Sequence, residues 1–286
     1  MGFSTKSLKY IQKYFNEVEN DISEIIFNIK PSGGMRQNHD RFLVYIKSSY
    51  ESNPKIIAKV FEDKKILNHE FETMNNLDLS PFKTPSTIKL FSDFFLMEKI
   101  KGNPLSDLIL ELDSKNSLLE ILKSVTEDLF LFHSQNFQTK DEIKVNGKTL
   151  VVNRGFTHGD FDPFNLIINK DNYFVIDWED FEKEGIQEFD LIHFLIMLGV
   201  CFFKNESTKE KSKKIISGEG NYGKYAGEIL KKYSCLSGKP ISNLINLISE
   251  YSKHRINRLK LNNREIDGFI HPYLVNLDLD MVGWDI

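Results

Sequence analysis

Cysteine is scarce in this sequence, whose 286 residues include only Cys201 and Cys235. Two cysteines do not build the disulfide framework of a small secreted domain, and they do not suggest a zinc site. The sequence therefore predicts a protein of a reducing compartment, and we expect it in the cytoplasm.

Long hydrophobic runs are also missing. The longest apolar run covers 191–203 and includes His193, whereas about 20 consecutive apolar residues are needed to cross a bilayer. Near the amino terminus, Lys6, Lys9 and Lys13 are spread through an amphipathic pattern, which is unlike the apolar centre of a secretory signal. We therefore expect no membrane insertion.

An excess of basic residues is absent as well. The chain has 37 Lys and Arg against 41 Asp and Glu, which gives a net charge of −4. The lysines at 209–214 alternate with Glu and Ser, as in a solvated loop, so the sequence predicts no nucleic-acid partner. Hydrophobic residues make up 41% of the chain and include 23 Phe, enough for the core of one large or two modest domains.

The segment 158–179 is the most informative part of the sequence. It reads His-Gly-Asp-Phe-Asp-Pro-Phe-Asn, then an apolar strand-like run, a turn at 170–172, a second strand-like run and Asp177. Two antiparallel strands joined by that turn would place Asn165 and Asp177 side by side, with Asp160 across a small gap. Carboxylate and amide oxygens are the ligands that Mg²⁺ prefers in proteins.

These residue types in this order indicate phosphoryl transfer. That reaction requires an aimed nucleophile, a held triphosphate, and neutralisation of the charge that develops on the phosphoryl oxygens. We expect Asp160 to accept or orient the proton of the attacking hydroxyl, and Asn165 and Asp177 to hold Mg²⁺. His158 is expected to brace the loop without reacting.

The His158-Gly159-Asp160 tripeptide, Asn165 and the Ile-Asp-Trp triplet at 176–178 resemble the signature of a known family. It is the aminoglycoside phosphotransferase and choline kinase family of protein-kinase-like enzymes. Two positions in the loop differ from the common pattern, since Asp162 stands where His is frequent and Phe164 stands where Gly is frequent.

The resemblance implies an α+β, two-lobed fold. A small β-rich lobe, 1–100, would bind the nucleotide, and a larger, mainly helical lobe, 101–286, would carry catalysis and the acceptor. Protein kinases have Arg at the position of Gly159 and Phe-Gly in place of Trp178-Glu179. The difference favours a small-molecule acceptor.

Candidate nucleotide contacts lie in the first hundred residues. Gly33 and Gly34 separate two strand-like segments and could bring backbone amides close to the phosphates. Lys59 lies in an apolar strand, where a partner carboxylate is expected, and the following helical pattern offers Glu70 or Glu72. We favour Glu70, and the resemblance supports a lysine on the α- and β-phosphates braced by such a glutamate.

Two further roles rest on the resemblance. The segment near Glu98 and Ile100 corresponds to the hinge between the lobes, whose backbone groups would bind the adenine edge. Asp190 corresponds to an aspartate that opens a helix and bonds back to the catalytic loop. An acid at a helix amino terminus is also favourable to the helix dipole, so both explanations apply to Asp190.

Acidic residues crowd the stretch 177–190, where Lys183 is the single base. A negative site mouth would attract a cationic acceptor and repel an anionic one. Glu179 and Asp180 are therefore candidate acceptor ligands. The seven acids are Asp177, Glu179, Asp180, Glu182, Glu184, Glu188 and Asp190.

The carboxyl-terminal residues Asp280 and Trp284 are further acceptor candidates. In the family that this chain resembles, terminal carboxylates help bind aminoglycosides, and aromatic residues surround the quaternary ammonium of choline. The predicted function is therefore Mg²⁺-dependent transfer of the γ-phosphate of ATP or GTP to a hydroxyl of a small, cationic acceptor. Choline, ethanolamine, homoserine and sugar kinases are the alternatives, and the oligomeric state is left open.

A nucleotide-binding module without transfer activity is a less favoured possibility. Such a module would be expected to have lost at least one catalytic group. This chain retains Lys59, Asp160, Asn165 and Asp177.

Overall fold

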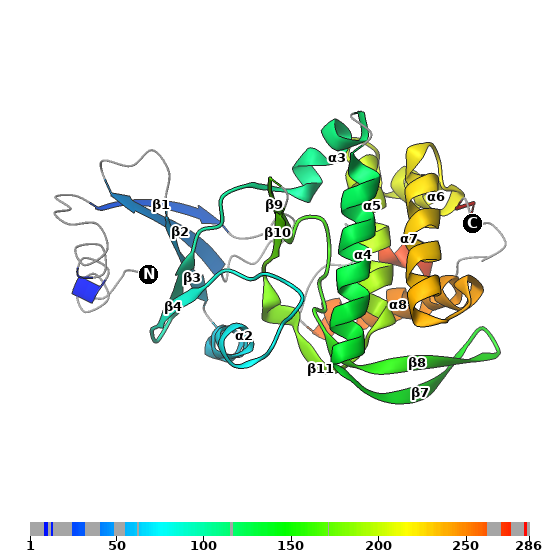
Figure 1. Cartoon of the computed structure of the whole chain (residues 1–286), viewed down its shortest axis with the longest axis horizontal. Coiled ribbons are helices and arrows are strands. Elements are labelled where there is room, and N and C mark those ends of the chain that lie inside the picture. Colours follow the sequence, from blue (N-terminus) through cyan, green and yellow to red (C-terminus); the bar gives the residue numbers. More distant parts are fainter. Residues whose placement is uncertain are drawn as a thin grey trace. The chain divides into compact units, whose positions relative to one another are not determined.

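Strands predominate in the first part of the chain and helices in the remainder, as the sequence predicts (Figure 1). Two compact units are distinguished by their internal contacts: unit 1 comprises 1–78 and 84–101, and unit 2 comprises 79–83 and 102–286. The assignment of 1–100 to nucleotide binding and of 101–286 to catalysis stays a prediction. The structure is a computed structural model that describes residues 9, 10, 13, 25–31, 41–48, 55–61, 63–114, 117–170, 172–261, 270–275, 283 and 284.

Unit 1 is built on a five-stranded antiparallel sheet with the strand order β1-β2-β3-β5-β4. Helix α2 (Lys64–Asn76) joins β3 to β4, and its amino terminus is capped by Asp63, whose carboxylate accepts a hydrogen bond from the Lys65 amide at 2.7 Å. The strands are β1 (Ile25–Pro31), β2 (Arg41–Ser48), β3 (Ile56–Phe61), β4 (Thr87–Leu90) and β5 (Phe94–Glu98).

Alternation along the strands gives this sheet two apolar faces. On one face, Ile57 and Phe61 of β3 pack in a cluster with Leu67 of α2. On the other face, Ile56 belongs to a separate apolar cluster. Lys59 lies between Ile57 and Phe61 in the strand, so it shares the face that α2 covers.

Helices make up most of unit 2. Helix α4 buries residues at three- and four-residue steps, as an amphipathic helix does, and α5 is buried on nearly every side, which explains its almost uninterrupted apolar sequence. No helix in the described ranges is both long and apolar enough to cross a membrane. The helices are α3 (Leu105–Ser114), α4 (Leu118–Gln135), α5 (Glu188–Phe202), α6 (Thr208–Ser217), α7 (Asn221–Ser237), α8 (Ile241–Leu261) and α9 (His271–Leu274).

Two small antiparallel sheets in unit 2 have the strand orders β11-β8-β7 and β10-β9-β6. Strand β8 leads into the segment 158–165 and β9 leads out of it, while β10 ends just before Asp177 and the short 3₁₀ helix η1 (Trp178–Asp180). The strands are β6 (Asn103–Pro104), β7 (Phe137–Val145), β8 (Lys148–Thr157), β9 (Leu166–Asn169), β10 (Asn172–Val175) and β11 (Glu182–Ile186).

Asn146 and Gly147 connect β7 to β8 in a tight hairpin. The last paired residues, Val145 and Lys148, leave a two-residue turn, and Asn146 and Gly147 have φ angles of 49° and 77°. Positive φ at both positions is the type I′ geometry that Asn-Gly favours.

An aromatic cluster lies against the segment 158–165. Phe82 contacts Phe132 and Phe161 with ring centroids 5.1 and 5.4 Å apart, and Trp178 contacts the His158 ring at 4.5 Å. Phe132, Phe161, Trp178 and His158 are fully buried. This packing fixes the base of the loop that carries Asp160 and Asn165.

Candidate active site

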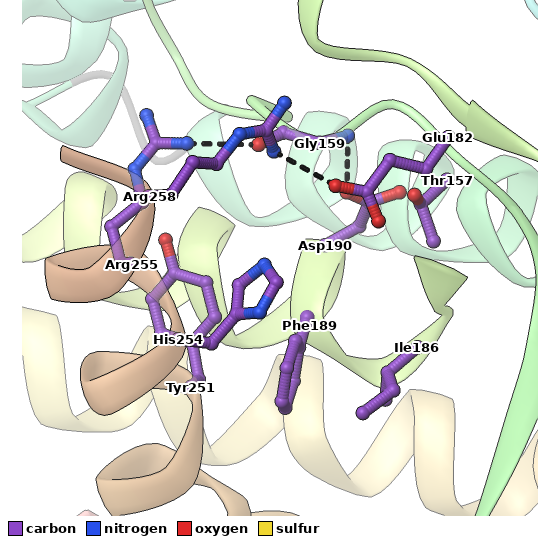
Figure 2. A pocket seen from close by; sticks show the side chains of 10 residues that line it. All are labelled: Thr157, Gly159, Glu182, Ile186, Phe189, Asp190, Tyr251, His254, Arg255 and Arg258. Carbon is purple, nitrogen blue, oxygen red and sulfur yellow. Dashed lines mark hydrogen bonds and ion pairs between the residues drawn. The ribbon is translucent and has the colours of Figure 1, made fainter. Parts of the chain in front are cut away.

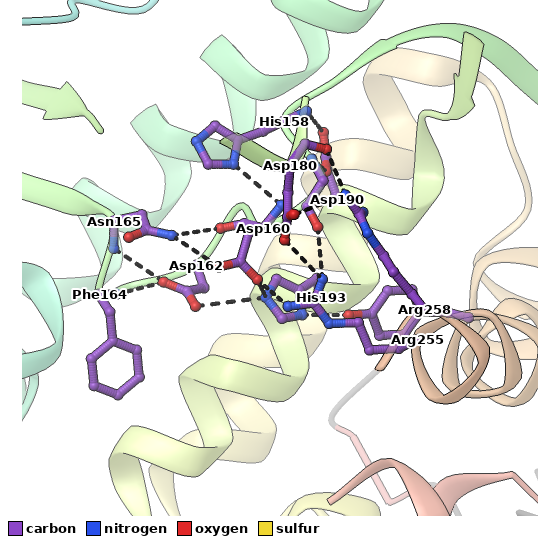
Figure 3. A network of polar contacts seen from close by, with 12 residues as sticks. His158, Asp160, Asp162, Phe164, Asn165, Asp180, Asp190, His193, Arg255 and Arg258 are labelled. Atoms are coloured by element: carbon purple, nitrogen blue, oxygen red, sulfur yellow. Dashed lines mark hydrogen bonds and ion pairs between the residues drawn. The ribbon is translucent and has the colours of Figure 1, made fainter. Parts of the chain in front are cut away.

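The loop between β8 and β9 is shaped by Asp162. Its Oδ1 accepts hydrogen bonds from the backbone amides of Phe164, at 2.8 Å, and of Asn165, at 3.0 Å. An aspartate that bonds to amides two and three residues ahead closes a tight turn. The turn sets the direction in which the Asn165 side chain leaves the loop, and Phe164 points away from the polar network (Figure 3).

Asp160 and Asn165 are in contact at one end of the β9–β10 hairpin, and the backbone of Asp177 lies at the same end. The last strand pair is Leu166 with Val175. Beyond it, the Ile176 amide donates to the Asn165 carbonyl at 3.0 Å, so Asn165 lies opposite Ile176, the residue before Asp177. The Asn165 side-chain amide donates to the Asp160 carbonyl at 2.9 Å and lies 3.4 Å from Asp160 Oδ2 (Figure 3).

The donor atoms at this end fit a magnesium ion. Because the Asn165 Nδ2 is directed to Asp160, its Oδ1 is the side-chain atom available as a ligand, and Asp177 adds carboxylate oxygens. Asp177 has a left-handed backbone, with φ 66° and ψ 60°, which is uncommon for a residue other than glycine and is seen in sharp functional turns. Hard oxygen ligands are the set that Mg²⁺ prefers.

His158 bridges two parts of the loop. Its Nδ1 accepts from the Asp160 amide at 3.3 Å, and its Nε2 lies 3.0 Å from the carbonyl oxygen of Ile176, to which it donates. Both ring nitrogens are therefore used for structure, in the manner expected for a bracing residue.

Asp190, in the first turn of α5, holds the same loop from behind. Its two carboxylate oxygens accept hydrogen bonds from the amides of His158 and Gly159, at 2.7 and 2.9 Å, and His133 Nε2 lies 3.3 Å away. Burial by itself would raise the pKa of Asp190, but its bond with His133 and the other bonds outweigh burial and keep its pKa below the usual value. The carboxylate is therefore ionised, as acceptance from two amides requires.

Gly159 has a steric reason to be glycine. Its φ is 78°, and a Cβ atom built on it would lie 2.0 Å from the carbonyl oxygen of Asp180. Any side chain at this position would displace either the loop or η1. The arginine that protein kinases have at the corresponding position could not be accommodated here.

Two residues that the sequence analysis did not select, Arg255 and His193, contact Asp160 directly. Arg255 of α8 donates to the Gly159 carbonyl at 3.1 Å and to Asp160 Oδ1. His193 of α5 has its Nε2 3.2 Å from the same oxygen. His193 could have been found, because an imidazole within a buried apolar run needs a polar partner. Arg255 left no comparable signal, since arginine on an amphipathic helix usually faces solvent.

The acids of 177–190 are largely engaged within unit 2. Arg258 of α8 pairs with Asp180 at 3.0 Å and with Glu182 at 3.3 Å, and Lys239 pairs with the buried Glu188 at 2.5 Å. Their negative charge is therefore offset locally, which weakens the expected attraction for a cation. The role of Asp180 as an acceptor ligand stays a prediction.

The other acceptor candidates are differently placed. Glu179 is 9% exposed, and its contact with an acceptor also stays a prediction. Trp284 is buried, donates its indole N–H to the Ile215 carbonyl at 2.6 Å and packs against Tyr222. This placement in the core does not support the expected contact with an acceptor. Asp280 lies outside the described residues.

A small cavity lies behind the loop, between α5 and α8 (Figure 2). Its volume is about 20 Å³, room for a single water molecule and not for an acceptor. The lining residues are Thr157, Gly159, Glu182, Ile186, Phe189, Asp190, Tyr251, His254, Arg255 and Arg258.

In unit 1, Lys59 and Glu70 form a buried ion pair. The Lys59 Nζ lies 2.7 Å from Glu70 Oε1, and the two side chains are 4% and 1% exposed. Glu72 is exposed, so Glu70 is the partner. Their contact with nucleotide phosphates stays a prediction.

Of the remaining candidate nucleotide contacts, the structure describes Glu98 and Ile100. The Glu98 amide already donates to the Ser86 carbonyl at 2.9 Å, which leaves the backbone around Ile100 as the better hinge candidate. Gly33 and Gly34 lie outside the described residues.

Comparison with known proteins gives a partial family match. The model of the RIO domain matches residues 47–184, a stretch that includes Lys59, Glu70 and the loop of Asp160. No curated protein sequence matches the chain significantly.

Three solved structures are similar over most of the chain. They are the streptomycin–ATP–APH(2″)-IIa ternary complex (15% identity, TM-score 0.46, 99% of both chains), ADP-bound aminoglycoside phosphotransferase APH(2″)-Ib (15%, 0.45, 96% of this chain and 98% of that one) and a Plasmodium vivax ethanolamine kinase (10%, 0.42, 98% and 86%). All three TM-scores lie below 0.5, so these likenesses indicate nothing about what this chain binds.

The match to the RIO domain, the order of strands and helices, and the loop geometry define the class: the fold is protein-kinase-like. The activity that this class supports is ATP-dependent phosphoryl transfer assisted by a divalent metal ion.

Proposed function

We propose that this chain is a small-molecule kinase of the aminoglycoside phosphotransferase and choline kinase type. It would transfer the γ-phosphate of ATP or GTP to a hydroxyl of a small acceptor. The observation that supports the proposal is the contact of Asn165 with Asp160, at the end of the β9–β10 hairpin where the chain continues into Asp177. One proton acceptor and two metal ligands are the groups that phosphoryl transfer requires.

Each group has a separate task in this proposal. Asp160 accepts a hydrogen bond from the acceptor hydroxyl and takes its proton as the new P–O bond forms. Asn165 and Asp177 hold Mg²⁺, which would neutralise charge on the phosphate oxygens when bound. In unit 1, Lys59, kept charged by Glu70, binds the α- and β-phosphates, and backbone groups near Ile100 bind the base.

The acceptor that we propose is a small alcohol carrying positive charge, as in aminoglycosides. The support is the charge of the segment 177–190, in which seven acids stand against Lys183. Pairing with Arg255, Arg258 and Lys239 reduces that excess without reversing it. Choline, ethanolamine, homoserine and neutral sugars are the alternatives.

A substrate panel tests this proposal. We expect Mg²⁺-dependent ADP or GDP release to be stimulated by one group among aminoglycosides, choline, ethanolamine, homoserine and common sugars. For a cationic acceptor, the KM should rise as ionic strength increases, because the Debye length falls from about 30 Å at 0.01 M to about 8 Å at 0.15 M. A KM that salt leaves unchanged would argue for a neutral acceptor, and failure to bind nucleotide at all would refute the kinase.

Replacing Asp177 with Ala should remove the magnesium-dependent part of nucleotide affinity. Loss of an indirect partner of a metal site commonly costs about 10- to 100-fold in affinity, and loss of a direct ligand should cost at least as much. The affinity for ADP would be measured calorimetrically with Mg²⁺ and with chelator.

Two further variants isolate the metal effect. Asp177→Asn tolerates the left-handed backbone and removes only the charge, so it should also weaken binding. Glu184→Ala removes an exposed acid of β11 and should bind as the wild type does. Undiminished affinity of Asp177→Ala for MgADP would remove Asp177 from the metal site.

A further inference from the structure

The Asp160 carboxylate is held by side chains from two helices outside the sequence motif. Arg255 of α8 contacts Oδ1, and His193 of α5 places its Nε2 3.2 Å from the same oxygen (Figure 3). Asn165 contacts the opposite edge, with its Nδ2 3.4 Å from Oδ2. The two oxygens of Asp160 therefore have different environments, with Arg255 and His193 both on Oδ1.

His193 also lies beside a second carboxylate. Its Nε2 is 3.6 Å from Asp162 Oδ2, and its Nδ1 is hydrogen-bonded to the Tyr251 hydroxyl. The side chains of His193 and Asp162 are 4% and 7% exposed, so neither is well solvated. Two carboxylates in one buried place repel each other unless a donor separates them.

The surroundings decide which ring nitrogen carries a proton. A carboxylate can only accept hydrogen bonds. Asp160 is ion-paired with Arg255, so the His193 nitrogen that lies 3.2 Å from its Oδ1 is stable there as N–H. Burial raises the pKa of Tyr251, which keeps its hydroxyl protonated and able to donate to Nδ1. Burial alone would lower the pKa of His193, but the adjacent carboxyl groups of Asp160 and Asp162 raise it above the usual value.

We propose that His193, with Arg255, is a positioning residue for Asp160, and that its Nε2–H attracts the carboxylate electrostatically at Oδ1. This inference rests on the proposed kinase function. It assigns Oδ2 as the atom that receives the acceptor proton, because Oδ1 is occupied by Arg255 and His193. Tyr251 fixes the ring orientation through Nδ1, so a chain of contacts runs from α8 through α5 to the catalytic loop.

A metal ion in place of the Nε2 proton is the competing arrangement. Asp160, Asp162 and His193 are close enough together to bind one. Arg255 already brings a positive charge to Asp160 Oδ1, however, and a metal ion at that oxygen would lie against the guanidinium. The two arrangements differ in whether Nε2 carries hydrogen.

The first experiment is a double-mutant cycle between His193 and Asp160, with MgATP and water as the reactants and phosphate release as the signal. His193→Asn should lower kcat by about 100-fold, the cost of displacing a catalytic group by about 1 Å, and leave the KM for MgATP within about twofold. The double variant with Asp160→Asn should be no slower than Asp160→Asn alone, since His193 acts through Asp160.

The matched control is His254→Asn, which removes an exposed imidazole from α8 and should not change kcat. Arg255→Lys keeps the charge and loses the two-point contact. Its kcat should lie between those of the wild type and Asp160→Asn. The positioning role would be overturned if the two substitutions lowered kcat by independent factors that multiply in the double variant. It would also be overturned if His193→Asn changed only the affinity for nucleotide.

The second experiment does not depend on activity. In protein labelled with ¹⁵N-histidine, long-range ¹H–¹⁵N correlations report the protonation of each ring nitrogen. We expect a protonated Nε2 for His193, and the signal should disappear in His193→Asn. An unprotonated Nε2, as a metal-bound ring requires, would refute the inference. If the wild-type protein transfers no phosphate, the proposed function fails, and these resonances alone decide whether His193 holds Asp160.

Discussion

Replacing Asp160 with Asn should abolish phosphoryl transfer while MgATP still binds. A positioned general base contributes about 10²- to 10⁴-fold to rate, and an amide cannot accept the proton. Metal and nucleotide are assigned to other residues, so their affinities should be nearly unchanged. Single-turnover transfer from γ-labelled ATP measures the chemical step, and calorimetry measures binding. Full activity of the variant would exclude Asp160 as the proton acceptor.

The neighbours of Asp160 add a condition to this experiment. Arg255 is 10% exposed and loses its charged partner on Oδ1, and among the described residues Asp180, 3.6 Å away, still pairs with it. Some loss of stability is therefore expected, and the thermal unfolding of the variant must be recorded beside its rate. Asp141→Asn is a matched control, because that carboxylate pairs with Arg154 on the β7–β8 hairpin.

Replacing Glu70 with Ala should produce the largest loss of stability expected in unit 1. The change leaves Lys59, which is 4% exposed, buried without the carboxylate that lies 2.7 Å from its Nζ. Breaking a buried pair by removing one partner typically costs about 3–5 kcal/mol. Urea unfolding, monitored by hydrogen exchange of the β3 amides, measures the loss of stability at the strand that carries Lys59. Glu72→Ala, on the exposed face of the same helix, should unfold as the wild type does.

A double replacement separates stability from function. Lys59→Met with Glu70→Leu removes both charges and keeps apolar volume, which is often neutral for stability. If Lys59 binds phosphate, this variant should regain the stability that Glu70→Ala lost and still fail to bind MgATP. Wild-type affinity in the double variant would remove the pair from the nucleotide site. Wild-type stability of Glu70→Ala would show that the pair contributes little to folding.

The hairpins could be predicted because their contacts are local. Asn146-Gly147 requires a particular turn, and the strand, turn and strand after Asn165 bring Asp177 next to it at the end of β10. Neither result depends on the rest of the chain, since the pairing partners are close in sequence. The candidate magnesium ligands were accessible to sequence reasoning for this reason.

The partner of Lys59 was predictable only in part. Strand alternation places Lys59 on the same face as Ile57 and Phe61, but helical spacing alone left Glu70 and Glu72 open. Packing of α2 on the sheet buries Glu70 and exposes Glu72. The choice between them therefore depended on how the helix is rotated about its axis.

The charge of the site could not be predicted from the sequence. The acids at 177–190 are visible in the sequence, but Arg258 and Arg255, which neutralise Asp180, lie on α8. The sequence around those acids does not predict their ion pairs with α8. The expected negative charge of the site was obtained by adding the charges of one segment. The electrostatic potential at the site, however, depends on the charges of every element that packs there.

The sequence by itself determined the class of chemistry, because the order of Asp160, Asn165 and Asp177 follows from one loop and one hairpin. Only the tertiary structure decided how Asp160 is held. Arg255 is 95 residues away in sequence, and an ion pair requires its atoms within about 4 Å. That approach is set by the packing of α5 and α8, which depends on apolar contacts along both helices and carries no signal beside the catalytic motif.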